Sequence, residues 1–344
     1  MVCNRSRGKH RNNLLRKGID IKHEFVICDQ HLEYLAKRKS NSELFSFRGV
    51  NLYVRCLAII AISLLLSSCV KDRVLDEIPT PAGIHDYSFF VAGHTYGAAG
   101  IDNEGLHPPF VEQWDYLNTY DQLDLGFLTG DIVSPNPTVQ DWIEVDRDLA
   151  DLDVRTFFAV GNHDMENRPL FEERYGSTYY SFTRHGDLFI VLDPNIDAWS
   201  ISGDQLTFLQ ETLTIEAENS QNIFVFFHQM IWWESDTIFS QVAMNSSAGR
   251  GDDVNFWNVV YPKFDILENE VYMFCGDLGA GSWSTDVMYW SEGNTTFIGS
   301  GMGDGPGDNY IIVDVDSDGV VNLKLIALGD DPGAMGELED WTLE

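Results

Sequence analysis

The feature that most constrains the fold is a repeated pattern of short apolar runs, each followed by turn-forming or polar residues. The runs are Tyr87–Ala92, Leu125–Thr129, Thr156–Val160, Leu188–Leu192, Ile223–Phe227, Val271–Cys275 and Thr296–Ser300. Their near-continuous apolar character predicts strands that are buried on both faces. Amphipathic helical patterns separate several of the runs, so the sequence predicts an α/β domain.

The clearest helical pattern covers residues 138–152, where Thr138 is suited to cap the helix and Trp142 and Val145 share one face. Weaker patterns cover residues 203–213 and 109–117. Near the end of the chain, residues 309–328 predict two strands joined by a turn at 317–319. The acidic residues after position 330 predict a solvated tail.

The first 68 residues differ in composition from the rest of the chain. They hold 12 of the 22 Lys and Arg residues but only 5 of the 54 Asp and Glu residues. An apolar core at Leu57–Leu66 follows Arg48 and Arg55. It is too short to span a bilayer, which requires about 20 residues, and it ends in small residues. This pattern predicts a secretory signal peptide.

The signal ends in Leu66-Ser67-Ser68-Cys69, which resembles a bacterial lipoprotein signal in which the cysteine becomes lipidated. The alternative is an ordinary cleavage site that contains a cysteine. The predicted organisation is a cytoplasmic extension and signal peptide at 1–68, a tether at 69–86, a single folded domain at 87–330 and an acidic tail at 331–344. We therefore expect a lipid-anchored protein outside the cytoplasm, in the periplasm or on the cell surface of a bacterial envelope.

The charge of the part after residue 68 is strongly negative, with 49 acidic and 10 basic residues. Such a surface repels nucleic acid and anionic membranes, and it attracts divalent cations. Of the five cysteines only Cys275 lies in the predicted domain, so no disulfide is expected within it.

Five of the apolar runs end beside a residue that can bind a metal or transfer a proton. These residues are His94, Asp131, Asn162 with His163, His228 and Asp277. Each alone has an ordinary interpretation, as a turn former or a packed histidine. Together, at the carboxyl ends of the strands of one predicted sheet, they lie where α/β sheets bind ligands. Carboxylate, amide and imidazole form a mixed donor set for a divalent metal.

The segments "GD" at 130–131 and "GNHD" at 161–164, with the histidines at strand ends, resemble the calcineurin-like metallophosphoesterases. The resemblance covers most of residues 87–328. It implies a four-layer α/β/β/α sandwich and metal-dependent phosphoester hydrolysis. It also implies that Asp131 matches the metal-bridging aspartate. His163 matches the histidine that protonates the leaving group or steadies the transition state.

Two motifs depart from that family. Ala92 stands where the aspartate of D-x-H is expected, and Asp277 and Gly279 replace the two histidines of G-H-x-H. These losses fall on one of two metal sites, so the resemblance implies a mononuclear centre. Its predicted ligands are Asp131, Asn162, His228 and Asp277. The ion is expected to be Mn, Fe, Zn or Mg, and the extra carboxylate favours the harder ions.

His94 is the histidine that remains of the altered D-x-H motif. It is expected to form a hydrogen bond to a substrate oxygen or to orient Asp131. When protonated, it would supply part of the missing positive charge. The predicted activity is metal-dependent hydrolysis of a small phosphoester or a phosphorylated glycan outside the cytoplasm. One alternative is an inactive envelope lipoprotein of the same fold that binds a phosphorylated glycan or a protein partner. Another is a hydrolase that acts on a different bond.

Three further features have two interpretations each. Trp232 and Trp233 either wall the pocket or pack in the core. Arg250 either meets a phosphate or lies in an exposed loop. A donor after His94 could replace the missing ligands, and the candidates are Asp102, Glu104 and His107.

Overall fold

The computed structural model describes residues 86–98, 100–101 and 105–344. The predicted signal peptide, the lipidation site at Cys69, the tether up to residue 85, Asp102 and Glu104 lie outside the described residues. Among the helices that are described, none has the length and apolar character that crossing a membrane requires.

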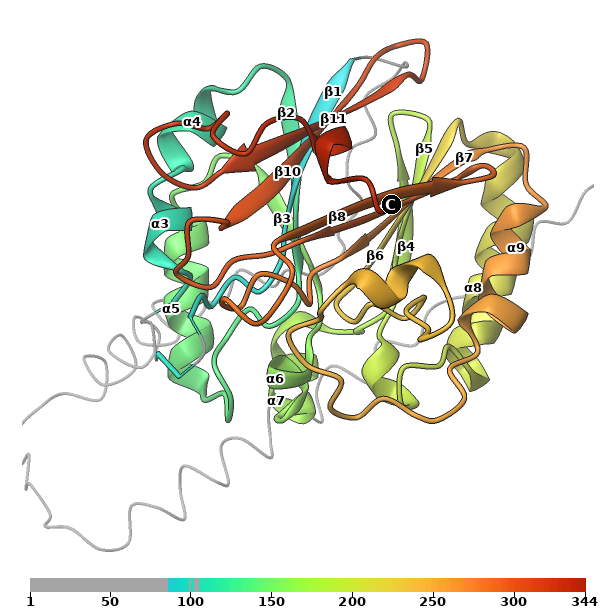
Figure 1. Cartoon of the computed structure of the whole chain (residues 1–344), viewed down its shortest axis with the longest axis horizontal. Helices are drawn as coiled ribbons and strands as arrows, with labels where there is room; N and C mark the ends of the chain where they lie inside the picture. The colour runs from blue at the N-terminus through green and yellow to red at the C-terminus, as the bar shows by residue number, and fades with distance from the viewer. Residues whose placement is uncertain (1–85, 99, 102–104) are drawn as a thin grey trace, which may run out of the picture. The chain divides into compact units, whose positions relative to one another are not determined.

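Two mixed β-sheets form the centre of the domain (Figure 1). In the first, in the order β11-β10-β1-β2-β3, the strands β1, β2 and β3 are parallel. Its strands are β1 (Tyr87–Ala92), β2 (Leu123–Thr129), β3 (Arg155–Ala159), β10 (Asn309–Val315) and β11 (Val321–Ala327).

In the second sheet, in the order β4-β5-β6-β7-β9-β8, the four inner strands are parallel and the two edge strands antiparallel. Its strands are β4 (Tyr180–Arg184), β5 (Asp187–Val191), β6 (Asn222–Phe227), β7 (Glu270–Cys275), β8 (Val287–Glu292) and β9 (Thr295–Ser300).

Helices cover the outer faces of both sheets, with α3, α4 and α5 beside the first sheet and α8 and α9 beside the second (Figure 1). The helices are α3 (Pro108–Val111), α4 (Trp114–Thr119), α5 (Val139–Leu149), α6 (Asn162–Met165), α7 (Arg168–Tyr175), α8 (Gly203–Glu216) and α9 (Tyr261–Asp265). Short 3-10 and π turns lie at Pro194–Ile196, Ala217–Asn219, Ile238–Gln241, Phe256–Val260 and Leu338–Trp341. The predicted four-layer α/β/β/α sandwich is confirmed.

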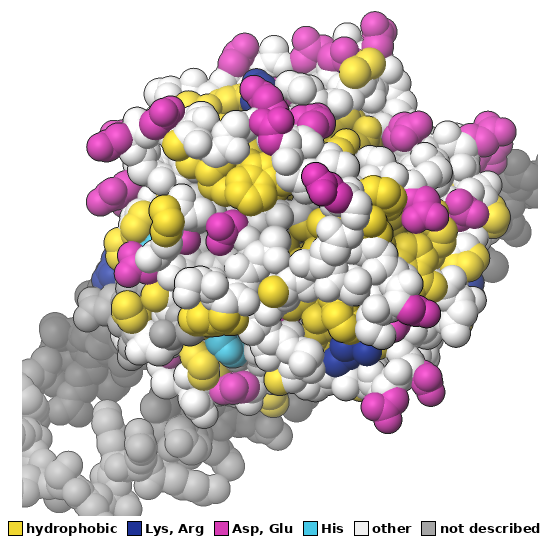
Figure 2. Space-filling view, in the orientation of Figure 1, with side chains coloured by type: hydrophobic (Ala, Val, Ile, Leu, Met, Phe, Trp, Pro, Cys, Tyr) yellow, Lys and Arg dark blue, Asp and Glu magenta, His cyan; other side chains and the backbone are white. Residues whose placement is uncertain are grey.

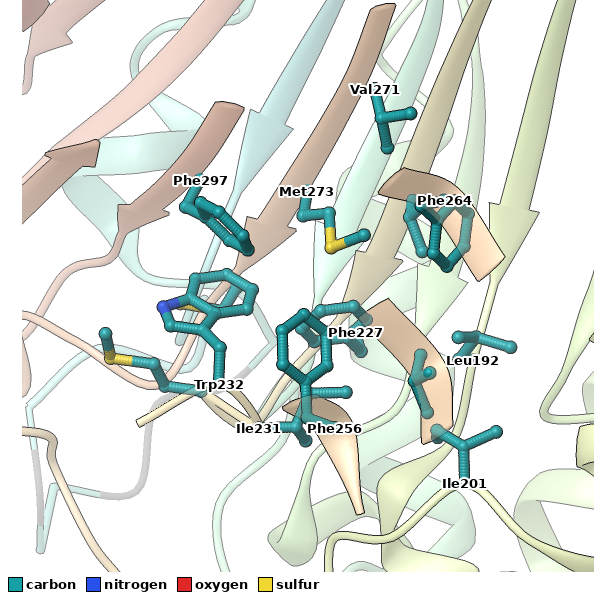
Figure 3. Packing of buried hydrophobic residues seen from close by; sticks show 14 of the residues in the cluster. Leu192, Ile201, Phe227, Ile231, Trp232, Phe256, Phe264, Val271, Met273 and Phe297 are labelled. Carbon is teal, nitrogen blue, oxygen red and sulfur yellow. The ribbon is translucent and has the colours of Figure 1, made fainter. Parts of the chain in front are cut away.

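The apolar runs are continuous because alternate residues of each strand enter different cores. In β1, Phe89 faces the second sheet whereas Phe90 faces the helices over the first. In β6, Phe226 belongs to the core between the sheets, and Phe227 belongs to the core beneath α8 and α9 (Figure 3). The sequence of a strand that is buried on both faces therefore does not alternate between polar and apolar residues.

The predicted helix at 138–152 is confirmed as α5, and the side chain of Thr138 accepts a hydrogen bond from the Gln140 backbone N–H. Asp141 completes a capping box by accepting from the Thr138 backbone N–H. The weaker pattern at 109–117 corresponds to two short helices, α3 and α4. The hairpin at 309–328 is confirmed as β10 and β11.

The acidic residues of the tail are exposed, as expected, but the tail also has a buried anchor in the core. Leu338 is fully buried in the core between the sheets, and Trp341 packs against the same core. Trp341 also donates from Nε1 to the Met335 carbonyl oxygen. Acidic residues dominate the composition here, but the few apolar ones determine where the segment packs.

Polar contacts join the two sheets at the amino ends of their parallel strands. Asp124 of β2 accepts hydrogen bonds from Arg184 Nη2 at 2.7 Å and pairs with His185 Nε2 at 2.8 Å. Burial acts to raise the pKa of Asp124, but the hydrogen bonds from Arg184 and His185 outweigh it and lower the pKa. Asp124 therefore stabilises the fold most where the unfolded carboxyl is also ionised, above its reference pKa of about 3.9.

We expect Asp124→Asn to lower the free energy of unfolding by about 1–3 kcal/mol at pH 7. The difference from wild type should shrink as the pH falls through the depressed folded-state pKa, because the wild-type carboxylate then becomes protonated. Urea unfolding between pH 7 and pH 3 measures this. The exposed Asp204→Asn is the matched control. An equal deficit at both ends of the pH range would contradict the assignment.

Candidate metal centre

The predicted site residues lie where the carboxyl edges of the two sheets meet. His94, Asp131 and His163 follow β1, β2 and β3 of the first sheet, whereas His228 and Asp277 follow β6 and β7 of the second. The expectation that one sheet carries all of them is therefore wrong. The strands alone could not reveal this, because parallel strands of either sheet have the same apolar pattern.

Glycines allow the two edges to approach closely. A Cβ on Gly130 would lie 2.5 Å from the Cβ of His228, and one on Gly276 would lie 2.0 Å from the Thr129 carbonyl oxygen. Gly130 also has a φ of 83°, which disfavours other residues. Gly130 and Gly276, which precede Asp131 and Asp277, are therefore required by packing at this junction.

Asp131 lies at the centre of the group and is almost fully buried. Its Oδ2 is 3.3 Å from His228 Nε2, 3.4 Å from His163 Nδ1 and 3.9 Å from His94 Nε2. Its Oδ1 accepts the backbone N–H of His163 at 3.0 Å. One oxygen of this carboxylate is thus fixed by the chain, and the other faces three imidazoles.

His228 connects Asp131 to Asp277. The Nδ1 of its fully buried ring lies 2.8 Å from the Thr129 carbonyl oxygen, so Nδ1 carries the proton there and Nε2 faces the carboxylates. Nε2 is 3.7 Å from Asp277 Oδ1. Among the residues that the structure describes, neither His228 Nε2 nor either carboxylate oxygen of Asp277 has a hydrogen-bond partner. Buried polar atoms are normally paired, so these three atoms suggest a missing group.

The charges at the centre depend on one another. Burial opposes ionisation of Asp131, but His228, followed by the other two histidines, holds its pKa well below the usual range. Burial alone would lower the pKa of His228, but Asp131 and then Asp277 raise it to about 10. Burial raises the pKa of Asp277 to about 8, against the opposing effect of His228. A positive charge is therefore favoured between these two carboxylates.

His94 lies beside Asp131, and its expected role, to bond a substrate oxygen or to orient Asp131, stays a prediction. Its Nδ1 lies 2.9 Å from the Met302 carbonyl oxygen, and its Nε2 faces Asp131. Burial lowers the pKa of His94 to about 4. The ring is therefore neutral near pH 7, contrary to the expectation that a protonated His94 supplies positive charge.

Helix α6 brings the "GNHD" segment to Asp131. Asn162 is its first residue, and the fully buried Asp164 holds the neighbouring loop. Asp164 accepts hydrogen bonds from the backbone N–H groups of Ile132, Val133 and Gly161 at 2.8–3.2 Å. This clamp fixes the segment that carries Asp131 against the segment that carries Asn162 and His163.

The donor set suits a divalent cation in its chemistry. Two donors that each lie about 2.1 Å from one ion are roughly 3.0–3.4 Å apart, close to the 3.3 Å between Asp131 Oδ2 and His228 Nε2. As the side chains lie, however, no group of three His, Cys, Asp or Glu residues in the described part of the chain is arranged to hold a metal. Metal binding at this centre therefore requires its side chains to change position.

The weaker candidates have structural roles. Trp232 is fully buried and packs on Phe297 in the core beneath α8 and α9 (Figure 3), which confirms the packing interpretation. Arg250 lies over the Trp233 ring and donates to the Glu234 carboxylate, so it is engaged within its own loop.

His107 does not contact Asp131 and pairs instead with Asp308. Its Nε2 lies 3.1 Å from Asp308 Oδ2, and Asp308 also accepts from the backbone N–H groups of Gly303, Asp304 and Gly305. The expectation that His107 replaces a lost ligand is therefore wrong. The pair holds the segment after β9 against the segment before α3.

The chain was compared with protein-family models, with curated proteins and with solved structures. No protein-family model and no curated protein matches the sequence. Among solved structures, a purple acid phosphatase from yellow lupin (Lupinus luteus) seeds superposes with a TM-score of 0.54 at 12% identity, covering 74% of this chain and 53% of that one. This chain thus spans about half of that phosphatase.

A second neighbour is a dimetal phosphatase from Danio rerio, with a TM-score of 0.49 and 14% identity over 71% of this chain and 99% of that one. At these identities the likeness shows the fold alone. The fold is the α/β/β/α sandwich that this chain shares with the lupin purple acid phosphatase.

One residue at the centre was missed by the sequence analysis. Tyr96 is buried, with its ring centroid 4.5 Å from that of His94 and 5.1 Å from that of His163. Burial, with Asp131 and Asp277 adding to it, raises the pKa of Tyr96 well above its usual range. Its only sequence signal is its position two residues after His94.

Proposed function

We propose that this protein hydrolyses phosphoesters and that it uses a single divalent cation at the centre around Asp131. The observation that carries the proposal is the meeting of buried carboxylates and imidazoles at two sheet edges, where His228 Nε2 and both carboxylate oxygens of Asp277 find no hydrogen-bond partner in the described part of the chain. The phosphatase fold of the lupin neighbour supports the same class of reaction at the level of the fold.

In this proposal Asp131, Asn162, His228 and Asp277 hold the cation. When bound, the cation polarises a phosphoryl oxygen and lowers the pKa of water. The Thr129 carbonyl oxygen holds one proton of His228 on Nδ1, so Nε2 is the nitrogen that would bind the cation, and it would give up its own proton to do so. Acidic side chains outnumber basic ones on the face shown in Figure 2, and this excess of negative charge attracts divalent cations to the protein.

His163 is proposed to pass a proton to the leaving oxygen. Its side chain is 18% exposed, whereas those of Asp131 and His94 are 4% and 3% exposed, so it is the group that solvent and substrate reach most easily. Its Nδ1 faces Asp131, which leaves Nε2 on the outer side of the ring for the substrate. General acid catalysis of this kind contributes about 10²–10⁴-fold to a rate.

Metal removal tests the proposal. We expect the purified protein to hydrolyse a chromogenic phosphodiester with added Mn²⁺, and we expect a chelator followed by dialysis to lower kcat/KM by about 10³-fold. Added Mn²⁺ should restore the rate, and His163→Ala should lower it at unchanged metal content. Activity that survives both the chelator and His163→Ala would refute the catalytic assignment.

A non-catalytic protein that binds a phosphorylated glycan or a protein partner is the second candidate. It is favoured by the lack, among the described residues, of a preformed group of three metal-binding side chains. Binding of a phosphorylated glycan, without hydrolysis in Mn²⁺, Fe²⁺, Zn²⁺ or Mg²⁺, would favour this candidate over the enzyme.

We also propose that the protein is anchored outside the cytoplasm through a lipid on Cys69. The apolar core at 57–66 and the lipobox at 66–69 support this. Metabolic labelling with palmitate should mark the wild type, and the label should be absent from Cys69→Ser. Equal labelling of both proteins would contradict the anchor.

A further inference from the structure

The spacing of the predicted ligands depends on how segments from two different sheets are joined. Asn162 follows β3 of the first sheet, whereas His228 follows β6 of the second. A metal site needs its ligands at defined positions, and the residues around the ligands set those positions. A contact that ties these two segments together therefore affects how well the centre holds a cation.

The side-chain amide of Asn195 makes such a contact. Asn195 lies in the 3-10 turn after β5 of the second sheet. Its Nδ2 donates to the Val160 carbonyl oxygen at 3.1 Å, and Val160 comes two residues before Asn162. Its Oδ1 accepts from Gln229 Nε2 at 2.6 Å, and Gln229 directly follows His228. One amide thus connects the two segments that carry these ligands.

The orientation of this amide is fixed by its neighbours. Asn195 Nδ2 also donates to Asp193 Oδ1 at 3.0 Å, so it faces a carbonyl and a carboxylate, which both accept hydrogen bonds and do not donate them. Arg168 of α7 donates to the other oxygen of the buried Asp193 at 2.7 Å. The amide is therefore held against α7, the helix that follows α6 in the chain.

Gln229 is an amide at a position where packing favours an apolar residue. Its side chain is fully buried, as are those of His228 and Met230 on either side of it in the sequence. Nε2 makes the bond to Asn195, whereas Oε1 has no hydrogen-bond partner in the part of the chain that the structure describes. Burying an unpaired amide oxygen costs free energy, so stability alone does not account for a glutamine here.

We propose that Asn195 and Gln229 are positioning residues of the centre, because the hydrogen bond between them holds the segment of Asn162 and the segment of His228 at the spacing that a divalent cation requires. The inference rests on the proposed function, since it assumes that a cation binds at the centre. It goes beyond that function by naming two residues outside the four proposed ligands, and neither belongs to the motifs that the sequence presents.

Asn195→Ala and Gln229→Met, alone and combined, test this. Gln229→Met removes the N–H donor and keeps a side chain of similar length. The matched control is Asn222→Ala at the opposite end of β6, because Asn222 Nδ2 also joins the sheets, through Asp187 Oδ1 and the Gly319 carbonyl oxygen. The Kd of Mn²⁺ by calorimetry, the unfolding midpoint of the metal-free protein, and kcat and KM for the phosphodiester are measured for each protein.

Each single variant is expected to bind Mn²⁺ about 10-fold more weakly than wild type. The double variant should bind it as Asn195→Ala does, because both substitutions break the same hydrogen bond. At saturating Mn²⁺ we expect a lower kcat with a smaller change in KM, since the substitutions displace ligands and leave the substrate contacts in place. Asn222→Ala should lower the unfolding midpoint and leave the Kd of Mn²⁺ unchanged, which separates positioning from a loss of stability.

A Gln229→Met protein that binds Mn²⁺ as tightly as wild type overturns the inference, and it does so even if Asn195→Ala fails to fold. Losses that add in the double variant overturn it too, as does an equal loss in Asn222→Ala or a wild type that binds no Mn²⁺. Hydrolysis that needs Mn²⁺ but is unaffected in both variants refutes the inference and leaves the proposed function standing. Mn²⁺ binding that depends on Asn195, in a protein that hydrolyses no phosphoester, supports the inference and refutes the proposed function.

Discussion

Asp131→Asn is expected to lower kcat/KM for phosphoester hydrolysis by about 10³-fold or more, at little cost to the fold. The reason is that the two oxygens of the Asp131 carboxylate make different contacts. Oδ1 accepts the His163 backbone N–H, and an asparagine oxygen can take over that bond. The asparagine NH₂ group then faces the histidines in place of Oδ2, and an N–H donor cannot bind a cation.

The measurements are steady-state hydrolysis and manganese content on the same preparations. Asp204→Asn, an exposed change of the same chemistry in the first turn of α8, is the control and should behave as wild type. Circular dichroism checks that the variant is folded. A folded Asp131→Asn protein that keeps both its manganese and its kcat/KM would remove Asp131 from the centre.

Phe127→Ala should lower the free energy of unfolding by about 3–5 kcal/mol. Phe127 of β2 is fully buried in the core between the sheets and stacks on Phe226 of β6, with ring centroids 3.8 Å apart. It also contacts the rings of Phe89 and Phe189. Truncation would therefore leave a cavity between two sheets whose backbones cannot close around it.

Urea unfolding at pH 7 measures this loss. The control is Ile266→Ala, because Ile266 is 78% exposed and its truncation removes little buried surface. We expect the control to change stability by less than about 0.5 kcal/mol. A loss below about 1 kcal/mol for Phe127→Ala would show that the sheets do not depend on this contact.

Much of the fold was accessible from the sequence because its strands are buried on both faces. The run Tyr87–Ala92 coincides with β1, and the Thr138 cap marks the start of α5. The assignment of β6 and β7 to a second sheet could not be read in this way, since the same apolar runs suit either sheet. The packing of Leu338 was also hidden, because one apolar residue among acidic ones carries little pattern.

The candidate site was predictable where a donor follows a strand, as for Asp131, His163 and His228. Their convergence depends on glycines such as Gly276, whose importance appears only when Thr129 is seen beside it. The neutral state of His94 could not be predicted, because it depends on burial and not on residue type. Tyr96 was missed because its place follows from backbone bonds to the next strand.

Manganese content per chain tests the central claim most directly. After the purified protein is loaded with Mn²⁺ and dialysed, elemental analysis should give about one ion per chain for wild type and a value near zero for His228→Ala, because ligand removal weakens a four-ligand site severely. A wild type with two ions, or with none, would contradict a single cation held by Asp131, Asn162, His228 and Asp277.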